Sequence, residues 1–268
     1  MQLTIAIHGA AGRMGQRLVA LVSAEPEMKL VAAIDAANHP RLGQDAGLLA
    51  GVGELGVPLT SSLSHAVDVV IDFSAPAGAM AIAETCLERR QALVLATTGL
   101  SVDQQARVRE ASRQIPLLWS PSMSLAVNLA MKLSSLAAAA LKDHPAGADV
   151  EIIERHHRYK EDSPSGTALK FGEIIAGVMG QKASQHGREG RVGARPHGEI
   201  GYHAVRVGDN PGEHTIIFGL LGETLEIAVK ATNRDCYAHG ALAAAKFLAG
   251  KPAGLYGMAD VLGLAPNQ

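Results

Sequence analysis

Cysteine and long apolar runs are both scarce in this chain, and each absence excludes a class of protein. Only Cys86 and Cys236 occur in 268 residues, too few for a disulfide framework or a zinc cluster. No apolar run reaches the roughly 18 residues that cross a bilayer. The first residues also lack the basic start and apolar core of a signal peptide. We therefore expect a cytoplasmic protein without a membrane partner.

An excess of charge of one sign is also missing. The 24 Lys and Arg residues nearly balance the 26 Asp and Glu residues, giving a formal net charge of −2. A protein that binds nucleic acid through a broad basic surface is therefore not expected. Apolar residues make up 47% of the chain and charged residues 19%, which indicates a folded protein with a substantial core. The length allows one large domain or two ordinary ones.

A glycine-rich turn near the start separates a predicted strand from a predicted helix. Apolar residues 3–7 are followed by Gly9-Ala-Ala-Gly12-Arg-Met-Gly15, and apolar residues then recur at helical spacing. Such a turn lets the backbone approach a pyrophosphate, which the N-terminus of the helix attracts. The spacing G-x-x-G-x-x-G departs from the common G-x-G-x-x-G, and a plain strand-to-helix turn is the alternative.

A second predicted strand, residues 29–34, ends in Asp35. An acidic residue about 20 positions after the glycine turn accepts hydrogen bonds from the adenosine ribose. No arginine directly follows Asp35, so NADH is favoured, while His39 or Arg41 leaves NADPH open.

Strands and helices then alternate along the first half. Apolar strands are expected at 67–71, 92–96 and 115–119, with helices at 77–89 and 101–114. This order is typical of a doubly wound parallel sheet of the Rossmann-like type. Ligands of such sheets bind beyond the carboxyl ends of the strands. The loops expected around the nicotinamide half of the cofactor are therefore 72–74, 97–99 and 120–123.

The second half has a different texture. We expect helices at 125–141, 164–179 and 236–248, and strands at 200–207, 214–221 and 224–232, with Gly222-Glu223 as a hairpin turn. The expected organisation is an α/β dinucleotide-binding domain over 1–124, an α+β substrate-binding and oligomerisation domain with an open mixed sheet over 125–232, and a helix over 233–268 that returns to the first domain.

A glycine-punctuated loop, residues 181–199, is long for a compact domain. Five Lys and Arg residues against two Glu residues between 182 and 206 give it a local charge of +3. A solvated flexible loop is the favoured interpretation, and a functional loop is the alternative.

The central segment 154–168 combines two histidines, a lysine and a Ser-Gly-Thr turn at a predicted helix start. Asp162 or Ser163 is a candidate cap and Pro164 suits the first helical turn. The N–H groups of residues 165–167 are then expected to be free to bind an anion. Residues 151–170 carry four basic and four acidic side chains, so selectivity must come from directed donors.

The two histidines are adjacent, and adjacent side chains of an extended segment face opposite ways. A two-histidine metal site is therefore not expected, and we predict no metal. A single histidine is most often only a hydrogen-bonded side chain, but clustering beside a lysine and a helix start favours proton transfer. The residues alone leave the two histidines unranked.

Segment 154–168, which reads ERHHRYKEDSPSGTA, resembles the catalytic motif of the 4-hydroxy-tetrahydrodipicolinate reductase family. The stretches 9–15, 96–99 and 208–215 resemble the same family in order and spacing, so the similarity spans the chain. It implies reduction of a small cyclic dicarboxylate with NADH or NADPH, in the diaminopimelate route to lysine. It also implies a homotetramer formed through the sheets of the second domain.

The resemblance implies individual roles as well. His156 becomes the proton donor or acceptor and Lys160 the proton donor. The implied substrate-binding residues are His157, Ser165, Gly166 and Thr167. The implied cofactor-binding residues are Gly9, Ala10, Ala11, Gly12, Arg13, Met14, Asp35, Ala96, Thr97, Thr98, Ser120, Pro121, Ser122 and Met123.

Two rival functions remain. A semialdehyde dehydrogenase needs a thiol nucleophile, but Cys86 has the surroundings of a helix packing residue and Cys236 follows Asp235, which disfavours a thiolate. A non-catalytic NADH-sensing module would need neither His156 nor Lys160.

Overall fold

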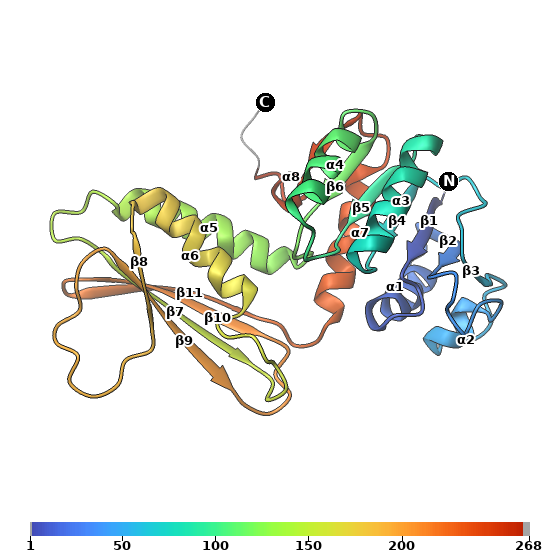
Figure 1. Ribbon diagram of the computed structural model, residues 1–268. Helices are drawn as coiled ribbons and strands as arrows, with labels where there is room; N and C mark the ends of the chain where they lie inside the picture. Colours follow the sequence, from blue (N-terminus) through green and yellow to red (C-terminus); the bar gives the residue numbers. More distant parts are fainter. Residues whose placement is uncertain (1, 265–268) are drawn as a thin grey trace. The chain divides into compact units, whose positions relative to one another are not determined.

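The computed structural model describes residues 2–264. It divides into two compact units (Figure 1). The first unit contains the chain up to Leu125 together with the stretch from Asp235 onward, and the second contains Ala126–Arg234. No helix among the described residues is long and apolar enough to cross a membrane.

The first unit is built on a seven-stranded sheet. Its strands are β1 (Leu3–His8), β2 (Met28–Ile34), β3 (Leu59–Thr60), β4 (Val69–Asp72), β5 (Ala92–Leu95), β6 (Pro116–Trp119) and β12 (Gly254–Tyr256). All neighbours pair in parallel in the order β12-β6-β5-β4-β1-β2-β3. The central strands are continuous apolar runs because both faces of the sheet are covered. The predicted Rossmann-like sheet is confirmed.

Helices cover both faces of this sheet. They are α1 (Arg13–Ala24), α2 (Ala46–Ala50), α3 (Pro76–Arg89), α4 (Val102–Ser112), α7 (Asp235–Leu248) and α8 (Met258–Val261). One apolar core packs α1 and α7 against the sheet, and a second packs α3 and α4 (Figure 1). Strand order reverses at β1 and β4, so the turn after β1 lies at the edge where such folds bind ligands.

The second unit contains a mixed five-stranded sheet. Its strands are β7 (Asp149–His156), β8 (Ala183–His186), β9 (Glu199–Arg206), β10 (Glu213–Leu220) and β11 (Glu223–Lys230), in the order β11-β10-β7-β9-β8. The β7–β9 and β8–β9 pairs are parallel and the others antiparallel. Helices α5 (Leu125–Leu141) and α6 (Gly166–Met179) pack on one face (Figure 1). The predicted open mixed sheet is confirmed.

Two local predictions in this unit were wrong. Helix α6 begins at Gly166 with Ser165 as its N-cap, so neither Asp162 nor Ser163 caps it and Pro164 precedes the helix. The cap is Ser165 because its hydroxyl accepts from the N–H of Ala168, three residues on. The β10–β11 hairpin turns at residues 221–222, one residue earlier than expected, and Gly222 takes the left-handed φ of +87° that the turn requires.

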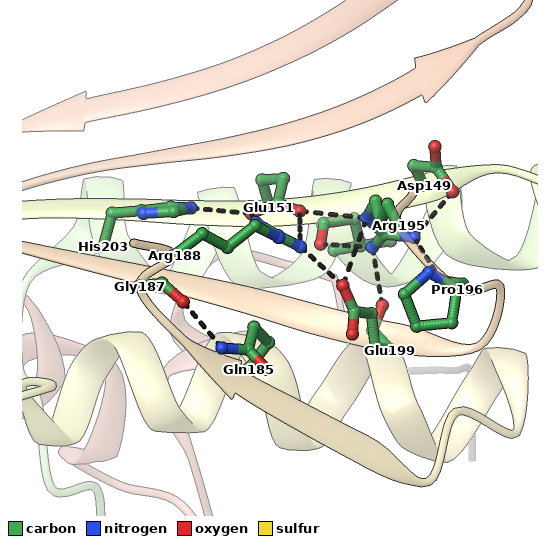
Figure 2. A network of polar contacts seen from close by, with 10 residues as sticks. Asp149, Glu151, Gln185, Gly187, Arg188, Arg195, Pro196, Glu199 and His203 are labelled. Atoms are coloured by element: carbon green, nitrogen blue, oxygen red, sulfur yellow. Dashed lines mark hydrogen bonds and ion pairs between the residues drawn. The ribbon is translucent and has the colours of Figure 1, made fainter. Parts of the chain in front are cut away.

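The loop over 181–199 is not simply solvated. It contains β8, and two of its arginines contact acidic side chains on the sheet (Figure 2). Arg188 donates to Glu151 and Glu199, and Arg195 donates to Asp149 and Glu151. Much of the positive charge of this loop is therefore paired with carboxylates of the same unit.

Candidate active site

Strand β7 alternates between its two faces, and this alternation selects the candidate catalytic side chains. Val150 and Ile152 lie in the apolar core beneath α6. The same face carries Glu154 and His156, which are 1% and 8% exposed. One buried face of β7 therefore carries apolar residues at its start and two ionisable residues at its end.

Glu154 is the centre of the hydrogen bonds here. Its Oε2 accepts from Nδ1 of His156 at 2.5 Å and from Arg206 at 2.8 Å. Its Oε1 accepts from Arg206 at 2.7 Å and from the N–H of Ser165 at 3.1 Å. Although burial raises the pKa of this carboxyl, the bonds from Arg206 and His156 hold it below its ordinary value.

The start of α6 provides backbone donors. The N–H of Ser165 is bonded to Glu154, so the prediction that it is free was wrong. The N–H groups of Gly166 and Thr167 lie in the first turn, where no intrahelical acceptor exists. A Cβ at Gly166 would meet nothing within 4 Å, so open space lies beside these donors.

His157 and Lys160 belong to the loop between β7 and α6. The N–H of His157 donates to the carbonyl of Asn210, and its Nδ1 is buried with no hydrogen-bond partner among the described residues. Lys160 Nζ donates to both carboxylate oxygens of Asp162, at 2.7 and 2.9 Å. Burial lowers the pKa of His156, and the charge of the nearby Lys160 adds to that shift.

Three residues of this cluster were missed as site residues. Arg206 on β9 holds Glu154, and His214 on β10 contacts the Ser165 hydroxyl through Nε2 at 3.0 Å. Gly212 lies so close to His156 that a Cβ there would be 2.9 Å from Nε2. The stretch 208–215 had been noted only for its family resemblance.

The turn after β1 has the geometry that a pyrophosphate needs. Gly9 has a φ of +77°, and a Cβ on Gly15 would lie 2.0 Å from the Gly9 carbonyl oxygen, so both positions require glycine. The N-cap of α1 is Gly12, with no side-chain cap and no acidic residue in the first turn. The helix start is therefore open to an anion.

Asp35 lies beside this turn. Its Oδ2 accepts from the N–H of Ala11 at 2.9 Å, and its Oδ1 from Ala36 at 2.8 Å. No cation within residues 2–264 contacts this carboxylate, so it is available to ribose hydroxyls. Arg13 and Met14 begin α1, and Ala10 is buried beneath the turn.

The two other predicted cofactor loops follow β5 and β6. Ala96 and Thr97 are buried while Thr98 is exposed, and the Thr97 hydroxyl donates to the buried carboxylate of Asp72 at 2.5 Å. His8 contacts the other oxygen of Asp72 at 2.6 Å.

A hydrogen bond within the loop after β6 stabilises its turn. The Ser120 hydroxyl donates to the carbonyl of Ser122, Pro121 is exposed, and Met123 is buried in the core. These loops and the glycine turn follow β1, β5 and β6 at the same edge of the sheet.

The two cysteines have raised pKa values. Burial raises the pKa of Cys86 to about 12, and burial also raises that of Cys236. Neither thiol is therefore suited to act as a nucleophile near neutral pH. Among residues 2–264 no group of three or more His, Cys, Asp or Glu side chains is placed to hold a metal ion.

Comparison with known families covers both units. The model described as "Dihydrodipicolinate reductase, N-terminus" matches residues 3–123, and that described as "Dihydrodipicolinate reductase, C-terminus" matches residues 126–262. The chain belongs to the dihydrodipicolinate reductase family. The resemblance noted in the sequence is thereby confirmed.

Individual relatives agree with this assignment. The chain is 56% identical over 273 residues to the 4-hydroxy-tetrahydrodipicolinate reductase of Rhodopirellula baltica, covering 99% of this chain and 98% of that one. It is 46% identical over 268 residues to the enzyme of the same name from Syntrophotalea carbinolica, covering 98% and 99%. The dipicolinate-bound dihydrodipicolinate reductase from Paenisporosarcina sp. TG-14 matches with a TM-score of 0.78 at 28% identity, over 96% of this chain and 98% of that chain.

Proposed function

We propose that the cluster around Glu154, together with the start of α6, forms the active site for the reaction of this family. The protein is an oxidoreductase that reduces 4-hydroxy-tetrahydrodipicolinate to tetrahydrodipicolinate with a pyridine nucleotide, on the diaminopimelate route to lysine. The observation that carries the site assignment is the buried His156–Glu154 pair joined through Ser165 to an open helix start. Family membership favours this enzyme over both a semialdehyde dehydrogenase and an NADH sensor.

The substrate is a small cyclic dicarboxylate, and the structural relative from Paenisporosarcina binds dipicolinate. The N–H groups of Gly166 and Thr167 bind one carboxylate at the positive end of α6. The buried, unpaired Nδ1 of His157 supplies a further polar contact. A helix N-terminus contributes only about 0.3 to 2 kcal/mol to anion binding, so a nearby cation is needed. Ser165 supports this cradle as its cap and exposes little surface of its own.

Lys160 and His156 exchange protons with the substrate. Lys160 is partly exposed, with its ammonium group held by Asp162 next to the helix start. An ammonium in this position neutralises a substrate carboxylate and donates a proton. Burial lowers the pKa of His156 below its ordinary value, although Glu154 opposes that shift. An imidazole held in place in this way can act as a general acid or base.

The turn of residues 9–14 holds the pyrophosphate and Asp35 the adenosine ribose of the cofactor. Residues 96–98 and 120–123 contact the nicotinamide half. The bound nucleotide supplies the hydride. NADH is favoured over NADPH because the carboxylate of Asp35 would repel a 2′-phosphate. The open N-terminus of α1 supports this cradle.

The open face of the second sheet supports a homotetramer. Ile153 and Val205 are 38% and 39% exposed on a sheet whose other face is covered by α5 and α6. Pairing of such faces between copies would bury them. Sedimentation at micromolar concentration tests this assembly, and a monomer there would contradict it. A cytoplasmic location is part of the same proposal.

Lys160→Ala is the direct test of the proton donor. We expect kcat to fall by about 10² to 10⁴ because a positioned acid is lost. The assay follows nucleotide oxidation at 340 nm with the condensation product of pyruvate and aspartate semialdehyde, run with NADH and with NADPH. The matched control is Lys170→Ala on α6, whose ammonium is paired with Glu173.

Each outcome of this assay bears on one part of the proposal. Lys160→Ala at the wild-type rate would show that the assignment of the acid is wrong. A higher kcat/KM with NADPH than with NADH would contradict the cofactor preference alone.

A further inference from the structure

Glu154 has more hydrogen bonds than a packing residue requires. Both carboxylate oxygens are used twice, and the four donors come from β7, β9 and the α6 cap. A buried carboxylate is costly unless it is paired and hydrogen-bonded. The bidentate Arg206 guanidinium meets that requirement and keeps Glu154 ionised.

This arrangement decides which nitrogen of His156 carries a proton. An ionised carboxylate only accepts hydrogen bonds, and Oε2 of Glu154 lies 2.5 Å from Nδ1 of His156. Nδ1 must therefore be the protonated nitrogen in the neutral ring. Nε2 is left as the atom that gains and loses a proton, and it lies against Gly212, where a Cβ would be only 2.9 Å away.

The same carboxylate is bonded to the substrate cradle. Its Oε1 accepts from the N–H of Ser165, the N-cap of α6. Displacement of Glu154 would therefore move the imidazole and the helix start together. No other carboxylate in residues 2–264 contacts both of these groups.

We propose that Glu154 is a positioning residue that holds His156 with Nδ1–H directed at its carboxylate and Nε2 as the proton-exchanging atom, while Arg206 keeps Glu154 ionised. This rests on the proposed function of His156. During turnover one proton enters or leaves at Nε2, and the Nδ1 proton stays on the ring.

Glu154→Gln makes a sharp test because an amide presents one acceptor and one donor to four donors. If the NH₂ group faced Ser165, it would oppose a backbone N–H, which cannot adapt. If it faces His156, the ring can adapt by moving its proton to Nε2. We therefore expect Glu154→Gln to populate the Nε2–H form and block proton uptake at that atom.

The expected readouts are spectroscopic and kinetic. In the wild type, ¹⁵N NMR of labelled histidine should show His156 as the Nδ1–H form, with assignment by loss of its signals in His156→Gln. In Glu154→Gln the Nε2–H form should appear and kcat should fall by about 10² to 10⁴, with a much smaller change in KM. Glu154→Asp, which retains the charge, should recover the Nδ1–H form and part of kcat.

The pH profile provides a second readout. The charged and titratable groups that face His156 are Glu154, Lys160, Arg206 and His214. Of these, Glu154 alone favours the protonated ring. Its removal should therefore move the limb of the kcat profile that belongs to His156 to lower pH.

The matched control is Glu151→Gln. Glu151 lies on the same strand and is also bonded to arginine and histidine (Figure 2). The alternation of β7 places it on the face opposite Glu154. This control variant should leave the ring form of His156 and the pH profile unchanged.

The possible outcomes separate this inference from the proposed function. A His156 ring in the Nε2–H form in the wild type overturns the inference even if Glu154→Gln does not fold. The inference also fails if Glu154→Gln loses activity with an unchanged ring form and pH limb. If Lys160→Ala and His156→Gln both keep the wild-type rate, the proposed function itself is wrong.

Discussion

At the scale of single residues, His214 is a buried imidazole with a strongly lowered pKa. Burial, reinforced by the nearby His156, lowers the pKa of His214 to about 4. Its Nε2 contacts the Ser165 hydroxyl and its ring packs against Phe171. The folded protein therefore strongly favours the neutral form of this residue.

This shift makes stability depend on pH in a defined window. The unfolded chain binds a proton on His214 below about pH 6.5, whereas the folded chain binds it only near pH 4. Stability is therefore lost as pH falls from about 6.5 to 4, by at most about 1.4 kcal/mol per pH unit from this group. His214→Gln should flatten that slope in urea unfolding, while the exposed His65→Gln should not. An unchanged slope in His214→Gln would assign the acid sensitivity to other groups.

At the scale of elements, the network in Figure 2 ties the loop after β8 to β7 and β9. Arg195 donates to the carboxylates of Asp149 and Glu151. It also donates to three carbonyls, those of Val150, Pro196 and Glu199. The bonds from Arg188, His203 and Arg195 overcome burial and hold the pKa of Glu151 at about 2. Its stabilising contribution is present above about pH 4.5 and is lost as pH falls toward 2.

Arg195→Ala should release this loop. We expect a loss of about 2 kcal/mol in the free energy of unfolding, because two carboxylates and three carbonyls lose a charged donor. Amide hydrogen exchange over residues 187–198 should accelerate. Arg191→Ala, in the same loop but exposed and outside the network, provides the control. Equal exchange rates in the two variants would mean that the loop is held by something else.

The elements also show what the sequence could predict. Strands of the first sheet were predicted because burial on both faces leaves continuous apolar runs. Helix α5 was predicted with its bounds, Leu125–Leu141, from a long run rich in alanine. The short α2, β3, β8 and β12 were missed, since two to five residues carry too little pattern and pairing decides them.

The candidate site was predictable only where its residues are local. The segment 154–168 was recognised, but the partners of Glu154 lie on other strands. Arg206 is 52 positions away in sequence, and Ser165 meets His214 across 49 positions. Contacts of this kind depend on strand register, which one sequence does not reveal. The expectation that the N–H of Ser165 is free was wrong for a similar reason, since its acceptor, Glu154, lies on β7.

At the scale of the whole molecule, the first unit is completed by a segment that comes after the second unit in sequence. Helix α7 packs Ala241, Ala244 and Ala245 into the core against α1. Its Gly240 lies so close to Met123 that a Cβ there would be 1.7 Å from the Met123 carbonyl oxygen. The end of the proposed nicotinamide loop is thus supported by a helix more than a hundred residues away in sequence.

Gly240→Ala should therefore affect both stability and cofactor binding in the first unit. The methyl group must displace backbone rather than a flexible side chain, so we expect a loss of roughly 1 to 3 kcal/mol and weaker binding of NADH. Gly177→Ala on α6 is the control, because a Cβ there would meet nothing within 4 Å and alanine favours the helix by about 0.5 to 1 kcal/mol. Calorimetry and NADH fluorescence titration measure the two effects. If Gly240→Ala binds NADH as tightly as the wild type, the loop that ends at Met123 does not contact the nicotinamide half through its backbone.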